Sequence, residues 1–190
     1  AVKPADVSTS IAFAVDTSAP IIEKLYTATA LDAGYFYTTS ANIESKYWTT
    51  ANAAVLGSGG TALADGSRLI PVGIENGALK CKKAKWEETS DLKYGGNSKS
   101  LYVGAVVTEG TGMSSFDVYL GGSSIPTSTL TPVNVGNKYY YCTETPYTMD
   151  SNYANGSLTL KAVATDSSDQ STPATRSLIV DNEGPYVTVS

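Results

Sequence analysis

The chain has 190 residues, carries 13 Lys and Arg against 18 Asp and Glu, and contains no His, which gives a formal net charge of −5. The mild acidity argues against a nucleic-acid partner, because nucleic-acid binding needs a basic stripe. The absence of His excludes hydrolytic triads of the usual kind, and no apolar run approaches the length of a membrane span. We therefore expect neither an enzyme nor a membrane-spanning protein.

The polar residues are mostly Ser, Thr, Gly, Asn and Tyr, and 13 Tyr against 3 Phe suit half-buried faces better than a dry core. Thr, Tyr and Val favour strands, and Gly favours the turns between them. This composition is typical of a secreted β protein, so we expect an extracellular or cell-surface location. No positively charged, apolar signal sequence opens the chain, and Ala1 is then a processed terminus.

One sequence motif occurs near both ends of the chain. Residues 10–20 read SIAFAVDTSAP and residues 176–185 read RSLIVDNEGP, each a β-patterned run followed by Val-Asp, three residues and Pro. Pro20 and Pro185 end the strand pairing, because proline has no N–H to donate. Each copy of the motif indicates the last strand of one module, a joint, and the first strand of the next module.

The first of these motifs indicates that residues 1–16 form an N-terminal arm, with a surplus strand over Ser8–Val15. Its apolar side chains alternate with small residues, and the second surplus strand, beyond the far joint, is also apolar. We expect this arm to pair with a neighbouring copy of the chain, as in donor-strand complementation. Pairing within its own chain is the alternative. The side chains expected to drive assembly are Ile11, Phe13, Val15, Tyr186 and Val187.

The body of the molecule begins with a strand over Pro20–Thr27, after which the pattern becomes irregular. Residues 28–98 contain short strands, a small-residue loop and a hairpin signal at Asn76-Gly77, a pair that favours the tight turn of a hairpin. We interpret this region as a β-rich insertion. The strands expected in it are 34–37, 43–49, 68–74 and 78–86.

Regular β-patterning returns after residue 100. The stretch Leu158–Thr165 alternates cleanly, with Leu158, Leu160, Ala162 and Ala164 on one face. Short strands separated by clusters of Gly, Pro, Asn and Ser favour an all-β sandwich. The strands expected here are 101–108, 116–120, 138–143, 158–165 and 175–180.

Several of these stretches resemble the immunoglobulin-like modules of bacterial and archaeal surface proteins. GMSSFDVYLGGSSI, from Gly112, resembles their third strand and its turn, and PYTMDSNYANGSLTLKAVATDSSDQST, from Pro146, resembles their sixth strand. VDTSAP and VDNEGP resemble the joints between modules. The resemblance implies a Greek-key immunoglobulin-like sandwich over residues 17–184, with residues 28–98 inserted between its first and second strands and a C-terminal extension at 185–190.

Cys81 and Cys142 are the only cysteines. An even number, outside any CxxC motif and in an expected secreted protein, favours a structural disulfide. The alternative is a pair of buried free thiols.

The joints and turns are rich in acidic residues that suit calcium, which takes several carboxylate and carbonyl oxygens as ligands. In modules of the kind that this chain resembles, acidic joints bind calcium between neighbours. The alternative is that Asp and Asn simply build turns. The candidate calcium ligands are Asp16, Asp166, Asp169, Asp181 and Glu183.

Two further motifs are weaker. Asn155-Gly156-Ser157 is a sequon for N-glycosylation, although Asn-Gly also serves as a turn. The adjacent acids Glu87 and Glu88 face opposite ways on a strand, so we interpret them as part of a solvated acidic loop and not as a catalytic pair. Glycans are a possible partner through a tyrosine face made of Tyr139, Tyr140, Tyr141, Tyr147 and Tyr153.

The leading hypothesis is a structural subunit of an extracellular filament, tubule or surface layer, assembled head to tail through the arm. The strand-exchanging filaments and cannulae of hyperthermophilic archaea are a family that this chain resembles in this respect. The rival hypothesis is an adhesive or glycan-binding module of a larger repeat surface protein. The two differ in whether the natural gene ends near Ser190, because a gene that continues into more such modules would favour the rival hypothesis.

Overall fold

The computed structural model describes residues 16–40, 43, 66–88, 93–95, 99–125, 130–149 and 153–181. The predicted arm strand, nearly all of the strand expected at 43–49 and the extension at 185–190 lie outside these residues. Within them, no helix is long and apolar enough to span a membrane. The strands are β1 (Ile21–Ala28), β2 (Phe36–Thr38), β3 (Arg68–Glu75), β4 (Ala78–Ala84), β5 (Lys93–Gly95), β6 (Lys99–Thr108), β7 (Met113–Leu120), β8 (Ser123–Ile125), β9 (Val133–Val135), β10 (Lys138–Cys142), β11 (Tyr147–Met149), β12 (Gly156–Asp166) and β13 (Ser171–Asp181).

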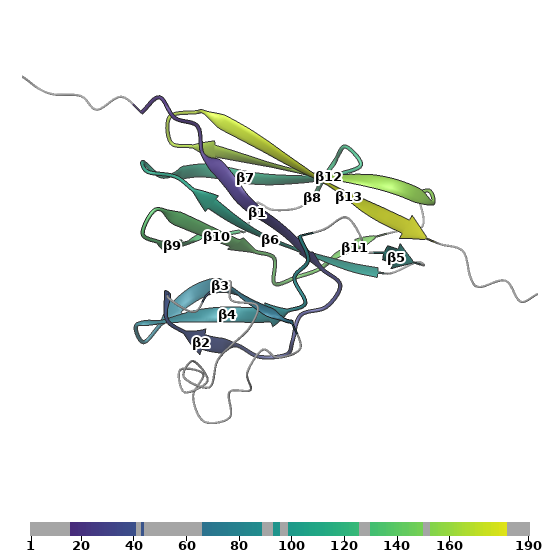
Figure 1. Ribbon diagram of the computed structural model, residues 1–190, viewed down its shortest axis with the longest axis horizontal. Coiled ribbons are helices and arrows are strands. Elements are labelled where there is room, and N and C mark those ends of the chain that lie inside the picture. The colour runs from purple at the N-terminus through teal and green to yellow at the C-terminus, as the bar shows by residue number, and fades with distance from the viewer. Residues whose placement is uncertain are drawn as a thin grey trace, which may run out of the picture.

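Two sheets pack face to face as a sandwich (Figure 1). One has the order β1-β6-β10-β9, with β11 added to β6, and the other has the order β5-β13-β12-β7-β8. We count β1, β6, β7, β9, β10, β12 and β13 as the first to seventh strands of the sandwich. The first, second, fifth and fourth of these then face the seventh, sixth and third, which is the immunoglobulin-like arrangement. The structure therefore confirms the predicted fold class.

The core between these two sheets follows from the period of two along each strand. Leu160, Ala162 and Ala164 of β12 are fully buried against the opposite sheet, whereas Lys161 between them is exposed. Successive side chains point to opposite faces of a strand, so one face of β12 meets the core and the other meets solvent. This sandwich core is the first core, and it also contains Leu25, Val103, Val107, Phe116, Val118, Leu120, Tyr141 and Leu178.

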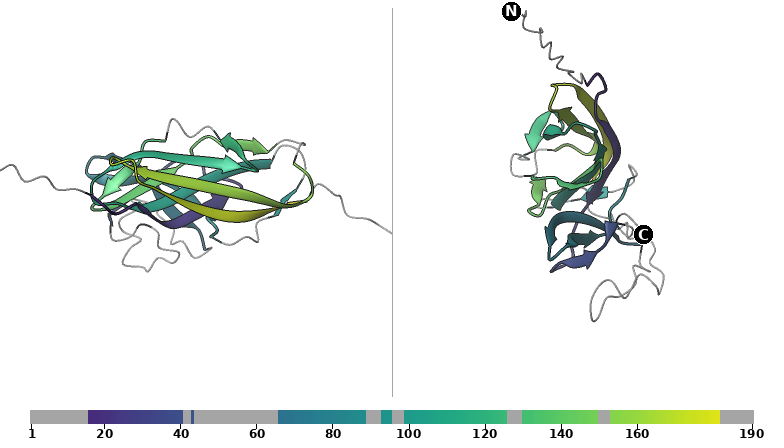
Figure 2. Two further views of the ribbon diagram at one scale, coloured as in Figure 1. Left: turned by 90° about the horizontal axis from the view of Figure 1, so that it is seen from above. Right: turned by 90° about the vertical axis from the view of Figure 1, so that its left-hand side faces the viewer.

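The insertion folds into a three-stranded sheet of order β2-β4-β3. Its hairpin turns at Asn76 and Gly77, whose φ angles of 51° and 80° are the two positive values that a tight two-residue turn requires. Because β1 pairs directly with β6, the insertion leaves the ladder of the sandwich continuous. Figure 2 shows the insertion sheet as a separate layer beside the sandwich, an arrangement that the sequence did not predict.

A second core lies between the insertion sheet and the outer face of the β1-β6-β10-β9 sheet. It contains Tyr26, Leu69, Ile70, Leu79, Cys81, Trp86, Val106, Val133, Tyr140 and Cys142. The two layers approach closely at Gly104 of β6, where a Cβ atom would lie 2.3 Å from Ile70 Cδ1 and 3.4 Å from the Trp86 ring. Only glycine at this position lets the insertion pack so close to the sandwich.

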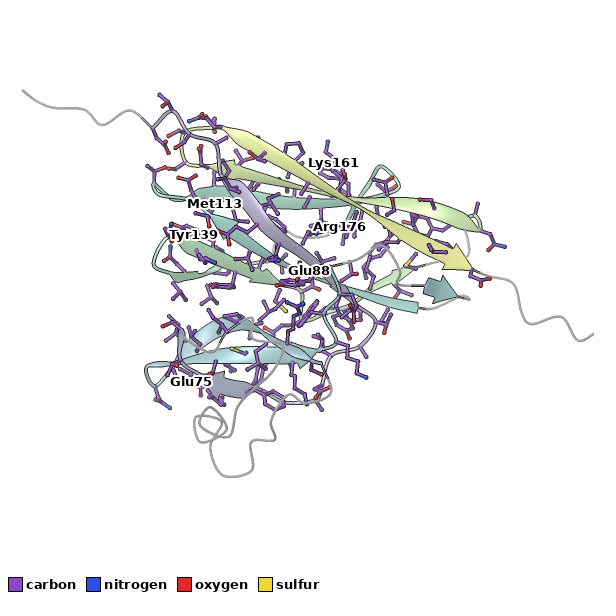
Figure 3. All side chains as sticks on the ribbon, in the orientation of Figure 1. Glu75, Glu88, Met113, Tyr139, Lys161 and Arg176 are labelled. Carbon is purple, nitrogen blue, oxygen red and sulfur yellow. The ribbon has the colours of Figure 1, made fainter. Side chains whose placement is uncertain are left out.

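A charged group also joins the insertion to the sandwich. Glu88 accepts Lys24 Nζ of β1 at 2.7 Å and Arg68 of β3 at 3.1 Å, and its side chain is only 24% exposed. Figure 3 shows Glu88 at the border of the two layers. Glu87 is fixed as well, because its backbone pairs with Thr27 through two hydrogen bonds of 2.9 and 3.0 Å. The prediction of a solvated acidic loop was therefore wrong at these two residues.

The predicted disulfide is not formed, because Cys81 and Cys142 are buried free thiols. Cys81 lies on β4 of the insertion and Cys142 ends β10 of the sandwich, and each belongs to the second core. Each Sγ is directed at a nearby carbonyl oxygen, that of Leu79 and that of Thr143, at 3.6 Å in both cases. The alternative prediction of two buried thiols holds, and they pack as small apolar groups.

Candidate functional site

The ends of three strands meet at one end of the sandwich. Asp16 precedes β1 and Glu109 follows β6. The antiparallel pairing of Ile21 with Thr108 places the start of β1 beside the end of β6. Asp166 ends β12 in the other sheet. One carboxylate oxygen of each of the three acids lies within 4.8 Å of those of the other two. We call Asp16, Glu109 and Asp166 the acidic cluster.

Asp16 is held by its own turn and by the loop after β6. Its Oδ1 accepts the Ser18 N–H at 3.0 Å and the Ser18 hydroxyl at 2.8 Å, and its Oδ2 accepts the Thr111 hydroxyl at 2.6 Å. Gln170 Nε2 donates to the Asp16 main-chain oxygen at 3.1 Å. The hydrogen bonds from Thr111 and Ser18 lower the pKa of Asp16 to about 2, so this carboxylate is ionised at neutral pH.

Glu109 is only 4% exposed, although it follows directly on the apolar strand β6. Its Oε1 accepts the Thr111 N–H at 2.8 Å and the Thr111 hydroxyl at 3.0 Å. A hydroxyl has one hydrogen to donate, so Thr111 cannot serve Asp16 and Glu109 at the same time. At any moment, one of these two contacts receives no proton from Thr111.

Asp166 is fully buried and begins the turn between β12 and β13. Its Oδ1 accepts two backbone N–H groups, from Ser168 at 2.8 Å and from Gln170 at 2.9 Å. Its Oδ2 is buried and has no hydrogen-bond donor among the residues that the structure describes. A buried carboxylate oxygen without a partner is costly and calls for an explanation.

The sequence predicted two of the three members of the acidic cluster, Asp16 and Asp166. It missed Glu109, although one signal was present: an acidic residue comes directly after an apolar strand that runs to the end of the sandwich. An acidic residue at a strand end is common, and only the pairing of β6 with β1 shows that Glu109 lies beside Asp16.

The remaining predicted calcium ligands do not join the acidic cluster. Asp169 lies in the same turn as Asp166, but its φ of 63° and its N–H bond of 3.3 Å to the Asp166 carbonyl oxygen give it a turn-forming role. Asp181 ends β13, at the opposite end of that strand from the cluster. Glu183 lies outside the described residues. For Asp169 the turn geometry agrees with the alternative prediction that Asp builds turns, and its role as a calcium ligand stays a prediction.

A second feature of interest is the edge of β13. This strand pairs with β12 from Ser171 to Val180 on one side, but on its other side only Ile179–Asp181 are paired, with β5. Over Ser171–Leu178 that side has no strand partner within the described ranges. Pro173 agrees with an open edge, because proline in a sheet directs its nitrogen away from a neighbouring strand.

The predicted tyrosine face is not present as one surface. Tyr140 packs in the second core and Tyr141 in the first, because neighbours on a strand face opposite ways, so Tyr139 is the half-buried member of the three. Tyr147 and Tyr153 are also half-buried, with their hydroxyl oxygens 3.0 Å apart. These five side chains therefore do not form a stacking platform for a glycan.

Two cavities flank the segment Thr143–Thr145, with volumes of about 320 and 330 Å³. The first is bordered by Val72 of the insertion and by Cys142, and the second by Leu101 and other residues of the first core. Burial raises the pKa of Cys142 far above its ordinary value, so its thiol stays protonated and is a poor nucleophile. Neither cavity gives support to a catalytic role.

Asn155 of the sequon is exposed in the loop before β12. Gly156 beside it has a φ of 119°, which fits the turn expected from the Asn-Gly pair. Exposure is needed for glycosylation but does not show it, so the modification stays a prediction.

No protein-family model matches the chain, and neither does any curated protein. Among solved structures, a chimeric titin Z1Z2 functionalized with an exogenous KLER peptide from decorin aligns with 48% of this chain and 90% of its own, at 20% identity and a TM-score of 0.30. The titin domains Z1Z2 in complex with telethonin align with 90% of this chain and 100% of their own, at 13% identity and a TM-score of 0.30. These values are too low to bear on function, and the assignment of the fold rests on the strand order.

Proposed function

We propose that the protein is a structural subunit of an extracellular filament, tubule or surface layer, joined head to tail by an exchanged strand. The observation that carries this proposal is the edge of β13 over Ser171–Leu178, which has no strand partner in the described part of the chain. Such an edge offers backbone N–H and C=O groups to an added strand. The arm, with its strand pattern, supplies a segment of the right kind.

The direction of such an exchange follows from the fold. The arm leaves one copy at Asp16, at the acidic-cluster end, and in a head-to-tail chain it enters the next copy at the far end of β13. It then runs parallel to β13, which is the direction that β5 already takes at Ile179–Asp181. Because donor and acceptor surfaces differ, the contact repeats without closing.

The arm also has the apolar side chains to make the contact favourable. Burial of Ile11, Phe13 and Val15 in a neighbour contributes about 1.5–3 kcal/mol each. This contribution offsets part of the cost of ordering the arm. The rival proposal of a glycan-binding module has less support, because the predicted tyrosine face is not assembled.

A pair of charge substitutions in the arm tests this function. Phe13→Asp is expected to abolish assembly of the full chain, since it places a carboxylate on the apolar face. Ser10→Asp puts the same charge on the opposite face of the strand and is expected to assemble. Light scattering and negative-stain images give the readout, and equal assembly by both variants would refute the exchange of this strand.

A second pair of substitutions tests the acceptor edge. Thr175 lies two residues beyond Pro173, so its N–H points to the same open edge, and Thr175→Pro is expected to block assembly while keeping the fold. Ala174→Pro is expected to remove a bond to β12 and to lower stability instead. Circular dichroism separates the two outcomes, and normal assembly of a folded Thr175→Pro protein would argue against this edge as the acceptor.

A further inference from the structure

The acidic cluster holds more negative charge than its own hydrogen bonds compensate. Asp166 is fully buried, and its Oδ2 has no donor among the residues that the structure describes. Asp16 and Glu109 share the single hydroxyl hydrogen of Thr111. Burial of an unpaired carboxylate oxygen is unfavourable, so a positive partner is expected.

No basic side chain in the described part of the chain fills that role. The ion pairs found there join Lys24 and Arg68 to Glu88, and three other lysines to acids outside the cluster. Gln170 reaches the cluster, but its amide donates to the main-chain oxygen of Asp16 and not to a carboxylate. Within the described residues the cluster therefore has no cationic partner, and a bound cation would supply one.

We propose that Asp16, Glu109 and Asp166 bind a divalent cation, and that the ion is Ca²⁺. Oxygen-only ligands suit a hard cation, and oxygens at about 2.3–2.6 Å from a calcium ion lie at most about 4.6–5.2 Å from one another. The ligand oxygens of the cluster lie within 4.8 Å of each other, which is within the separation that two ligands of one calcium ion can have. Mg²⁺ binds at about 2.0–2.1 Å and requires a tighter set.

This site differs from the calcium site that the sequence suggests between neighbouring modules. All three carboxylates belong to one chain, and they come from both sheets of its sandwich. Asp16 is also the last residue of the arm, so the ion fixes the base of the arm to the body of its own subunit. The proposal is independent of strand exchange, because a single copy contains the three ligands.

The test uses the full chain at low protein concentration, with CaCl₂ titrated in a calorimeter and thermal unfolding followed with CaCl₂ and with EDTA. A saturable binding isotherm of about one ion per chain is expected, together with a melting temperature that rises with the logarithm of the calcium concentration. This rise must not depend on protein concentration, because the site lies within one chain.

Two turn variants give a matched comparison. Asp166→Asn keeps an oxygen that accepts the Ser168 and Gln170 N–H groups but removes the charge, so in EDTA it is expected to melt no lower than the unmodified protein and to lose the response to calcium. Asp169→Asn removes a charge from the same turn, in a residue with positive φ that Asn tolerates, and is expected to keep the full response. Glu109→Gln provides the same test should Asp166→Asn fail to fold.

Three results would overturn the proposal. One is an unmodified protein that neither binds calcium in the calorimeter nor melts higher with it. Another is a calcium response that survives in both Asp166→Asn and Glu109→Gln. The third is a response that appears only as the protein concentration rises, which would place the ion between copies.

Discussion

The central strands of the two sandwich sheets, β6 and β12, are buried in different ways. In β12, fully buried Leu160 and Ala162 flank exposed Lys161. In β6, by contrast, Ala105, Val106 and Val107 are all fully buried. The two strands occupy equivalent positions in their sheets, so the difference comes from what covers their outer faces.

The outer face of β6 is covered by the insertion, and the outer face of β12 meets solvent. An immunoglobulin-like sandwich without an insertion would expose Val106 and Tyr140, which here belong to the second core. The insertion is therefore a third layer and not an appendage, and its stability is linked to that of the sandwich through the contacts at Gly104. Damage to the second core is expected to release the insertion first, whereas damage to the first core unfolds both.

The largest expected effect is that of truncating Trp86, which is 1% exposed in the second core. Trp86→Ala is expected to cost about 3–5 kcal/mol of unfolding free energy. Hydrogen exchange should rise chiefly in β2, β3 and β4. Leu160→Ala in the first core is the matched change, with a cost of about 2–5 kcal/mol, and it should raise exchange in both layers. Uniform exchange in the Trp86 variant would contradict the layered picture.

The next effect concerns the close approach at Gly104. Gly104→Ala places a methyl group against Ile70 Cδ1, which is itself fully buried, so a loss of about 1–3 kcal/mol is expected. Ile70→Val removes the colliding atom and alone costs about 0.5–1.5 kcal/mol. Urea denaturation of the double variant should show a smaller loss than the sum. Simple additivity would mean that the two residues do not meet.

A smaller effect is expected from the charged contact between the layers. Glu88→Gln leaves Arg68, 19% exposed, without its carboxylate partner, and a loss of about 1–2 kcal/mol is expected. Glu75→Gln removes a more exposed contact to Lys80 within the insertion, and a smaller loss is expected because solvent screens an exposed ion pair. Urea denaturation at low and high salt compares the two, and an equal loss in both variants would show that Glu88 gains nothing from its burial.

Acid is expected to weaken the same contacts. Burial opposes ionisation of Glu88, but Lys24 and Arg68 outweigh it, so its pKa is below the ordinary 4.5. The Thr108 hydroxyl and Lys138 likewise lower the pKa of Glu23. In both cases the unfolded chain takes up protons first as the pH falls, so the contribution to stability is complete well above pH 4.5 and is lost below it. Unfolding free energies measured between pH 6 and pH 3 check this, and Glu88→Gln should reduce the slope.

The smallest expected effect is that of a reducing agent. Because Cys81 and Cys142 are free, dithiothreitol should leave the unfolding free energy unchanged. Burial raises the pKa of Cys81 to about 12, so iodoacetamide should modify the folded protein very slowly. After unfolding without reductant, mass spectrometry should find both thiols modified. If the two cysteines react with iodoacetamide only after reduction, the protein contains a disulfide.

Local patterns in the sequence were sufficient to predict individual strands and turns. The period of two in Leu158–Thr165 predicted a strand with one buried face, and Asn76-Gly77 predicted the hairpin turn, because both depend only on neighbouring residues and on the geometry of the backbone. The modular motifs also gave the immunoglobulin-like fold and the place of the insertion. Where a predicted strand lies within the described residues, its boundaries agree with the structure to within a few residues, but the short strands β5, β8, β9 and β11 were not predicted.

Which distant residues come into contact depends on the tertiary structure. Glu109 joins Asp16 because β1 and β6 pair in antiparallel register, and Asp166 reaches them from the other sheet; no local pattern encodes such proximity. Cys81 and Cys142 share a core without bonding, and Glu88 is drawn from a loop into a contact with Lys24 and Arg68. In each case the packing of one layer on another set the surroundings of the side chain, and those surroundings lie far away in the sequence.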